Sequence, residues 1–184
     1  MEKEYRKLSE IRNDTNGRHI EGYALVFNSQ SNDLGFYETI LPSAVDNDTI
    51  KRSDVFALLD HDMNKGVLAR SKYGVGNLKL TVDKRGLKYE FDALDNELGN
   101  TVLQYLRSGI IDSSSFAFTV AQDGDDWERR NGVDYRTIKK IDRLFDVSPV
   151  FNPAYAATTS SCRSYERFKE THKSDVDEML ELLS

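Results

Sequence analysis

Apolar and polar residues alternate in short runs along most of the chain, and turn signals separate the runs at nearly even intervals. Such alternation is typical of strands that bury one face. Residues 95–107 differ, because their apolar positions recur at helical spacing between an expected N-cap at Asp95 and a stop at Gly109. The pattern predicts a mainly β fold with α-helix (α+β), an antiparallel β-barrel of about seven strands with surrounding helices. The expected strands cover residues 19–28, 36–41, 55–62, 67–70, 78–82, 87–93, 109–118, 135–141 and 144–150. Gln122 to Gly132 is expected to be a polar loop, and Pro149 and Pro153 are expected to end the sheet.

One of these strands, Gly109 to Phe118, contains three consecutive serines. Alternation sends Phe116 and Phe118 into a core and leaves only small residues on the other face, Ser115 among them. A hydroxyl on such a face is open to a substrate backbone, so Ser115 is a candidate nucleophile. The alternative is a polar turn that leads into an ordinary strand.

The end of the chain has a different composition. Residues 1–163 are long enough for one compact domain, whereas residues 164–184 are acidic and predict an amphipathic helical tail. Such a tail packs on its own barrel or docks as a helix in a groove of a partner protein. Its apolar stripe consists of Val176, Met179, Leu180 and Leu183.

Composition narrows the classes of partner. The net charge of -6 argues against nucleic acid as the main binding partner. No apolar run approaches the ~20 residues that are needed to span a bilayer. The basic run Arg136 to Lys140 alternates like a strand and is expected to be a solvated face. The N-terminus lacks an apolar signal core, which favours a cytoplasmic start. Cys162 is the only cysteine, so an incidental thiol is expected there and no disulfide.

Cofactor and metal sites are not expected. The three histidines lack zinc spacing, and the glycines form no phosphate-binding loop. The run Asp123 to Asp126 resembles a calcium loop but lacks its twelfth-position ligand, which favours a solvated hairpin.

Three residues can together make an activated nucleophile. His61 ends an apolar strand between two aspartates, Ser115 lies on its small face, and Asp146 interrupts an apolar run where an unpaired carboxylate is costly. An imidazole can take the hydroxyl proton while an acid holds its tautomer. The alternatives are a core-edge histidine, a turn serine, and an aspartate paired with Arg143.

Five segments between about His19 and Arg163 stand out together: Gly22 to Asn28, Glu38 to Ala44, Leu59 to Asp62, Gly109 to Phe118 and Asp146 to Tyr155. In their order and spacing, these segments resemble the prohead maturation proteases of tailed DNA phages, relatives of the herpesvirus assemblin serine proteases. If the resemblance holds, the partner on which the tail docks would be scaffold, capsid protein or a second protease chain.

The resemblance implies an assemblin-like fold and roles for particular residues. It makes His61 the general base and Ser115 the nucleophile. The family usually has an acid, often Glu, where this chain has Asp146, and Asp60 or Asp62 could serve instead. The implied chemistry is acyl transfer without a cofactor.

The implied function is that of a serine endopeptidase of prohead maturation, at work in the host cytoplasm inside the assembling prohead. Its substrates would be scaffold protein or the scaffolding segment of the capsid protein, together with itself. Neither nucleic acid nor membrane is an expected partner, and a homo-oligomer is allowed. The alternative is a catalytically silent β-barrel that binds capsid or scaffold protein as a morphogenesis module.

Overall fold

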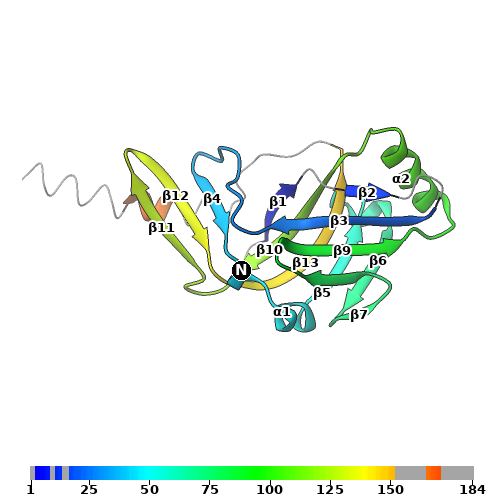
Figure 1. The fold of residues 1–184 in the computed structure, drawn as a ribbon, viewed down its shortest axis with the longest axis horizontal. Helices are drawn as coiled ribbons and strands as arrows, with labels where there is room; N and C mark the ends of the chain where they lie inside the picture. The colour runs from blue at the N-terminus through cyan, green and yellow to red at the C-terminus, as the bar shows by residue number, and fades with distance from the viewer. Residues whose placement is uncertain (1–2, 9–10, 14–16, 152–164, 171–184) are drawn as a thin grey trace, which may run out of the picture.

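The computed structural model describes residues 3–8, 11–13, 17–151 and 165–170, and its strands form three sheets (Figure 1). The first has the order β1 (Glu4–Leu8), β10 (Ser113–Val120), β13 (Ile141–Val150), β5 (Asp54–Leu58), β6 (Val67–Lys72), β7 (Val75–Gly76). The second has the order β2 (Ile11–Asn13), β3 (His19–Val26), β9 (Gly86–Asp92), β8 (Lys79–Val82). The third has the order β11 (Asp125–Arg130), β12 (Val133–Ile138), β4 (Tyr37–Ile40).

The mainly β, α+β class is confirmed, but the expected closed barrel is not found among the described residues. Most strand pairs are antiparallel, while β13 with β5 and β12 with β4 are parallel. Evenly spaced turns predict many short strands, but the described residues form thirteen of them and not about seven. Closure into a barrel depends on which distant edges pair, and local spacing does not encode that.

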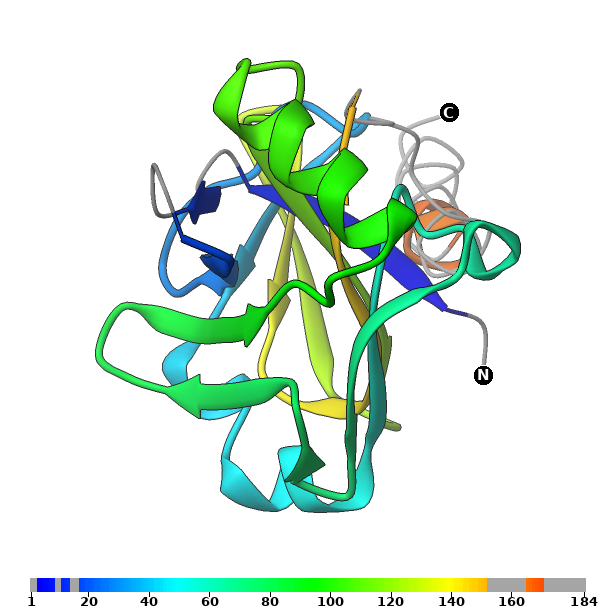
Figure 2. The same ribbon diagram turned by 90° about the vertical axis from the view of Figure 1, so that its right-hand side faces the viewer.

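Helices cover the ends of the sheets. Figure 2 shows α2 (Glu97–Arg107) lying across one end, and α1 (Asn47–Arg52) lies at the other. The N-cap of α2 is Asn96, whose side chain accepts a hydrogen bond from the Gly99 amide at 2.8 Å, and not Asp95 as expected. Short 3-10 turns are η1 (Pro42–Ala44) and η2 (Met63–Lys65). Within the described residues, none of the helices has the length and apolar character to cross a membrane.

The core contains one face of β10, as the alternation predicts. Phe116 and Phe118 stack with ring centroids 4.8 Å apart, and they join a cluster with Leu25 of β3, Leu87 of β9 and Val102 of α2. Strand β10 lies between β1 and β13, so both of its edges are paired. The packed phenylalanines and the paired edges hold the opposite face of β10, with Ser115, in a fixed position.

Strand β11 lies in residues expected to form a polar loop. It pairs with β12 as a hairpin that extends away from the first two sheets (Figure 1). Its charged side chains find partners across the hairpin, as in the Arg129–Asp134 ion pair at 2.6 Å. Cross-strand charge pairs stabilise this strand although its composition is polar. Polarity alone predicted a loop, because composition does not show such pairs.

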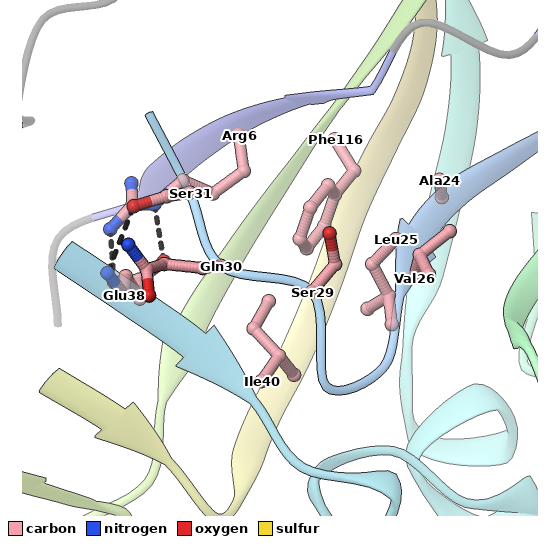
Figure 3. A pocket seen from close by; sticks show the side chains of 10 residues that line it. All are labelled: Arg6, Ala24, Leu25, Val26, Ser29, Gln30, Ser31, Glu38, Ile40 and Phe116. Carbon is pink, nitrogen blue, oxygen red and sulfur yellow. Dashed lines mark hydrogen bonds and ion pairs between the residues drawn. The ribbon is translucent and has the colours of Figure 1, made fainter. Parts of the chain in front are cut away.

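A buried charge cluster joins the first and third sheets. It consists of Glu4 and Arg6 of β1, Glu38 of β4 and Arg136 of β12, with exposures of 1%, 9%, 2% and 2%. Arg6 bonds Glu38 at 2.5 Å and Arg136 bonds Glu4 at 2.6 Å; Figure 3 shows Arg6 reaching Glu38. The prediction that the basic run forms a solvated face is therefore wrong for Arg136. Strand alternation sends this side chain inward, and carboxylates from two other strands pair with it there.

We expect Arg136→Met to lower the free energy of unfolding by about 3–5 kcal/mol, because it leaves Glu4 and Glu38 short of a counter-charge in the interior. Denaturant unfolding followed through Trp127, the only tryptophan, measures the loss. The matched control is Arg130→Met, since Arg130 is 63% exposed and its pair with Glu128 is solvated. Equal losses in the two variants would show that the cluster contributes no more than a surface pair.

The cluster also predicts acid sensitivity. Burial alone would raise the pKa of Glu38, but Arg6 and then Arg136 lower it below the ordinary value of 4.5. A lowered carboxyl pKa stabilises the folded state above pH 4.5, and this contribution is lost as pH falls through the folded-state value. Unfolding free energies measured from pH 7 to pH 3 should therefore fall below pH 4.5. The unfolding free energy of the double variant Arg6→Met/Glu38→Met should fall less steeply with decreasing pH. Equal slopes for the variant and the wild type would contradict the prediction.

Six residues of the predicted tail, 165–170, are helical. Tyr165 and Phe168 stack on Trp127 of β11 with ring centroids 5.3 Å and 5.6 Å away. The Tyr165 hydroxyl donates to Asp134 at 2.8 Å. This first part of the tail thus packs on the third sheet, while the apolar stripe and Cys162 lie outside the described residues. The division into 1–163 and 164–184 stays a prediction.

Candidate active site

His61 lies on a tight bend just after β5. Both Asp60 and His61 have φ of 59°, the left-handed region that side chains seldom occupy and that is concentrated at functional sites. The Asp60 amide donates to the carbonyl of Pro149 in β13 at 2.9 Å. This bond ties the bend to β13, and so it holds His61 beside that strand.

Asp146 of β13 meets His61 there. The register between β13 and β10 shifts next to Asp146. Ala117 is opposite Asp146, but the next residue of β10, Phe118, is opposite Leu144. The extra residue, Phe145, is a β-bulge, a feature that re-aims neighbouring side chains. The Asp146 Oδ1 atom is hydrogen-bonded to His61 Nδ1 and accepts a hydrogen bond from Ser148 Oγ at 2.7 Å.

The other candidate acids have different partners. Asp62 accepts a hydrogen bond from the Asn64 amide at 2.9 Å and caps η2. Asp60 lies 3.5 Å from the Lys65 ammonium. Arg143, the alternative partner of Asp146, is exposed. Of the aspartates considered from the sequence, Asp146 is therefore the one in contact with the imidazole.

Ser115 faces the same side of the sheet as this pair. It lies directly opposite Ser148, and side chains of opposite residues in antiparallel strands share a face. The Ser113 hydroxyl donates to Asp112, and the Ser114 hydroxyl donates to the Tyr23 carbonyl at 3.3 Å. Ser115 is 6% exposed, and its hydroxyl has no hydrogen-bond partner among the residues that the structure describes. Ser115 is therefore the serine of the three with an uncommitted hydroxyl.

The second ring nitrogen of His61 completes the arrangement. Its Nε2 atom is buried and has no hydrogen-bond partner in the described part of the chain. An imidazole whose Nδ1–H is held by a carboxylate carries its free electron pair on Nε2. Such a nitrogen can accept a proton from a hydroxyl placed next to it.

Sequence reasoning missed two residues at this site, Ser148 and Tyr5. Ser148 is fully buried and follows Asp146 by two positions, so strand alternation could have placed both on one face. The ring of Tyr5 lies edge-on to His61, with centroids 4.7 Å apart. Its position follows from the pairing of β1 with β10, which no local pattern indicates. Pro149, expected to end the sheet, lies within β13, beyond the two residues that pair with β5.

A small cavity lies on the other side of β10. It has a volume of about 80 Å³ and extends from Phe116 to the Arg6–Glu38 pair (Figure 3). Phe116 leaves the strand on the side opposite Ser115, so the cavity is separated from the site by the sheet.

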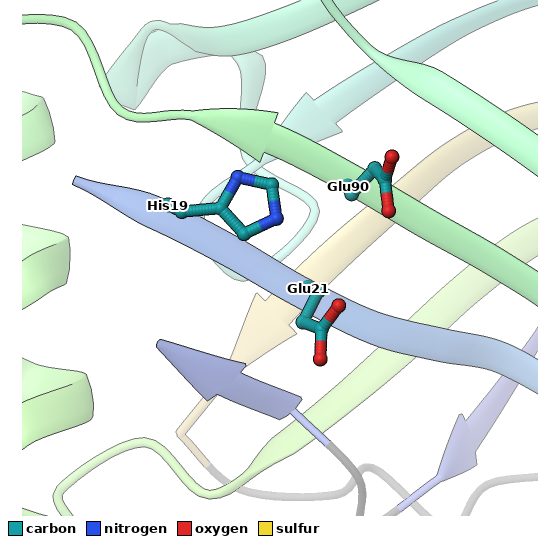
Figure 4. A group of neighbouring side chains, drawn as sticks. All are labelled: His19, Glu21 and Glu90. Carbon is teal, nitrogen blue, oxygen red and sulfur yellow. The ribbon is translucent and has the colours of Figure 1, made fainter. Parts of the chain in front are cut away.

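The second sheet carries a group of potential metal ligands. His19 and Glu21 of β3 and Glu90 of β9 have ligand atoms within 4.8 Å of one another (Figure 4). The Lys88 ammonium contacts Glu21 at 2.6 Å and Glu90 at 3.1 Å. Hydrogen bonds to Glu21 and then Glu90 raise the pKa of Lys88 to about 12. A protonated lysine already neutralises these carboxylates, so the group fits a surface ion-pair network better than a metal centre.

Comparison with known proteins identifies the family of the chain. Residues 6–172 match the sequence pattern of the caudovirus prohead serine proteases. No curated protein sequence matches the chain. Among solved structures, the chain is similar to the capsid assembly protease of bacteriophage T4, with 11% identity and a TM-score of 0.48 over 83% of this chain and 100% of that one. Because the family match spans nearly the whole sequence, the chain belongs to the caudovirus prohead serine protease family.

Proposed function

We propose that this protein is a serine endopeptidase in which Ser115 is the nucleophile, His61 the general base and Asp146 the orienting acid. The observation that carries the proposal is the state of His61. Its Nδ1 is bound to Asp146, which lies on the face of the sheet that holds Ser115, and its Nε2 is buried with no hydrogen-bond partner among the described residues. Membership of a serine protease family supports the same chemistry.

In the proposed reaction, Ser115 Oγ attacks the carbonyl carbon of a peptide bond while His61 Nε2 takes the hydroxyl proton. The tetrahedral intermediate collapses, the C–N bond breaks, and His61 returns the proton to the leaving amine. Water then attacks the acyl-enzyme, again with His61 as base, and releases the acid and free Ser115. Asp146 stays ionised, and its charge stabilises the imidazolium formed in each half-reaction.

Ser148 has a supporting part in this proposal. Its hydroxyl donates to the same Asp146 oxygen that holds His61, and it is fully buried. Ser148 would therefore hold the carboxylate in the orientation in which it meets His61 Nδ1.

The family supports a proposal for the substrate class. Because the chain belongs to the prohead serine proteases, we propose scaffold protein, or the scaffolding segment of the major capsid protein, as the substrate. The protein would act inside the assembling prohead in the host cytoplasm and would also cleave itself. Residues 156–161 consist of alanine, threonine and serine, a composition typical of segments that proteases cleave, and we expect self-cleavage close to them.

The direct test uses purified full-length protein with a fluorophosphonate probe, followed by peptide mapping. Labelling on Ser115, together with cleavage of the phage's own capsid protein or scaffold, is the expected result. Labelling on Ser113 or Ser148 would contradict the assignment of the nucleophile. Absence of both labelling and cleavage, with tight binding of capsid protein, would favour the silent morphogenesis module.

A further inference from the structure

The N-terminal strand lies beside the strand that carries the proposed nucleophile. Strand β1 pairs antiparallel with residues 114–118 of β10 and forms the outer edge of the first sheet. Tyr5 is opposite Ala117, and Ala117 is in turn opposite Asp146. Tyr5, Ala117 and Asp146 thus form a row across three strands, with all three side chains on the face that holds Ser115.

The imidazole of His61 contacts both ends of this row. Its Nδ1 is bound to Asp146, and the Tyr5 ring packs against it at 4.7 Å between centroids and an interplanar angle of 75°. Between these two contacts lies Ala117, whose single methyl group leaves room for a ring above it. Burial and then the Asp146 charge raise the pKa of the Tyr5 hydroxyl, so the phenol is neutral. Tyr5 is 36% exposed, and its ring therefore forms the outer wall of the His61 site.

The neighbours of Tyr5 anchor the strand that carries it. Glu4 and Arg6 point to the opposite face of β1, where they belong to the buried charge cluster with Glu38 and Arg136. Arg6 lies opposite Phe116 on the core side of β10. Strand β1 is thus held by charges on one face while its other face supports the imidazole.

We propose that Tyr5 is a positioning residue for His61, which makes the N-terminal strand a working part of the active site. This inference rests on the proposed function. The hydrogen bond to Asp146 fixes one atom of the imidazole but lets the ring swing about that atom. The edge-to-face contact with Tyr5 restricts this swing and keeps Nε2 directed at Ser115. Misplacement of a reacting group by about 1 Å can cost roughly 100-fold in rate.

The test measures how fast a fluorophosphonate labels Ser115 in full-length protein, with the maximal rate constant separated from the half-saturating concentration. We expect Tyr5→Ala to lower the maximal rate by roughly 100-fold and to leave the half-saturating concentration unchanged. Tyr5→Phe keeps the ring and should label at the wild-type rate. The matched control is Tyr37→Ala, which removes another strand tyrosine from a ring pair, the 5.8 Å stack on Tyr135 in the third sheet, and should leave the rate unchanged.

The outcomes separate the two proposals. Failure of the wild-type protein to label at Ser115 would overturn the proposed function itself. Wild-type labelling together with an undiminished rate in Tyr5→Ala would overturn the positioning role alone. If Tyr5→Ala does not fold, Tyr5→Leu retains bulk without the flat ring and should show the same slow labelling; a wild-type rate would reject the role. If Tyr5→Phe is labelled as slowly as Tyr5→Ala, the effect belongs to the hydroxyl, which would contradict positioning by the ring.

Discussion

Ser115→Ala is expected to lower proteolysis by roughly a million-fold, the loss typical of removing the nucleophile from a catalytic triad. The proposed mechanism has no second route to the acyl-enzyme once this hydroxyl is gone. Folding should be unaffected, because the Ser115 side chain makes no core contact of the kind that Phe116 makes on the opposite face. Cleavage of the capsid or scaffold substrate measures activity, and thermal unfolding measures stability.

The neighbouring serines are the matched controls for this prediction. Ser113 and Ser114 lie in the same strand and are as buried as Ser115, yet their hydroxyls are bound to Asp112 and to the Tyr23 carbonyl. Ser113→Ala and Ser114→Ala should therefore retain most of the activity. A reversal, with Ser115→Ala active and either neighbour inactive, would assign the nucleophile to a different residue.

His61→Ala is expected to match the serine variant, with a loss of roughly a million-fold, because nucleophile and base act as one unit. Without the imidazole the Ser115 hydroxyl has no group to take its proton, and the leaving amine has no group to supply one. The double variant Ser115→Ala/His61→Ala should be no slower than either single variant. Additive losses would mean that His61 acts separately from Ser115.

Asp146→Asn should lower proteolysis less, by roughly ten-thousand-fold. The orienting acid sets the tautomer and charge of the imidazole but takes no part in bond making. The amide keeps the shape of the carboxylate and loses its charge. Asp62→Asn is the control, since the Asp62 side chain caps η2 by accepting a hydrogen bond from the Asn64 amide. Equal losses in the two variants would remove the special role of Asp146.

Several features could be predicted because they depend on neighbouring residues. Alternation in residues 113–118 places Phe116 and Phe118 in the core and Ser115 on the other face, and the structure has this arrangement. Helical spacing predicts α2 to within two residues at its start. In both cases backbone geometry determines the direction of each side chain from its position in the element, so no distant contact is needed.

Local pattern failed where polar residues have distant partners. Residues 125–130 were expected to form a loop and instead form β11, and Arg136 was expected to be solvated and instead is buried, because charged side chains are exposed unless something pairs with them. Their partners come from other strands: Asp134 and Glu4 supply the carboxylates. Arg136 and Glu4 are 132 positions apart, so only the sheets bring them together, whereas Arg129 and Asp134 face each other across the short β11–β12 turn. Composition reveals neither pair.

The sequence by itself determined the mainly β class, the faces of β10, and a short set of residues able to activate a hydroxyl. Only the tertiary structure decided that three open sheets replace a barrel, that Asp146 rather than Asp60 or Asp62 meets His61, and that Tyr5 forms its outer wall. The physical reason is the range of the interactions. A strand's alternation is set by its own backbone, whereas the contact of His61 with Asp146 depends on the parallel pairing of β5 with β13 and on the bulge at Phe145. These pairings depend on the packing of the whole chain, which no single segment encodes.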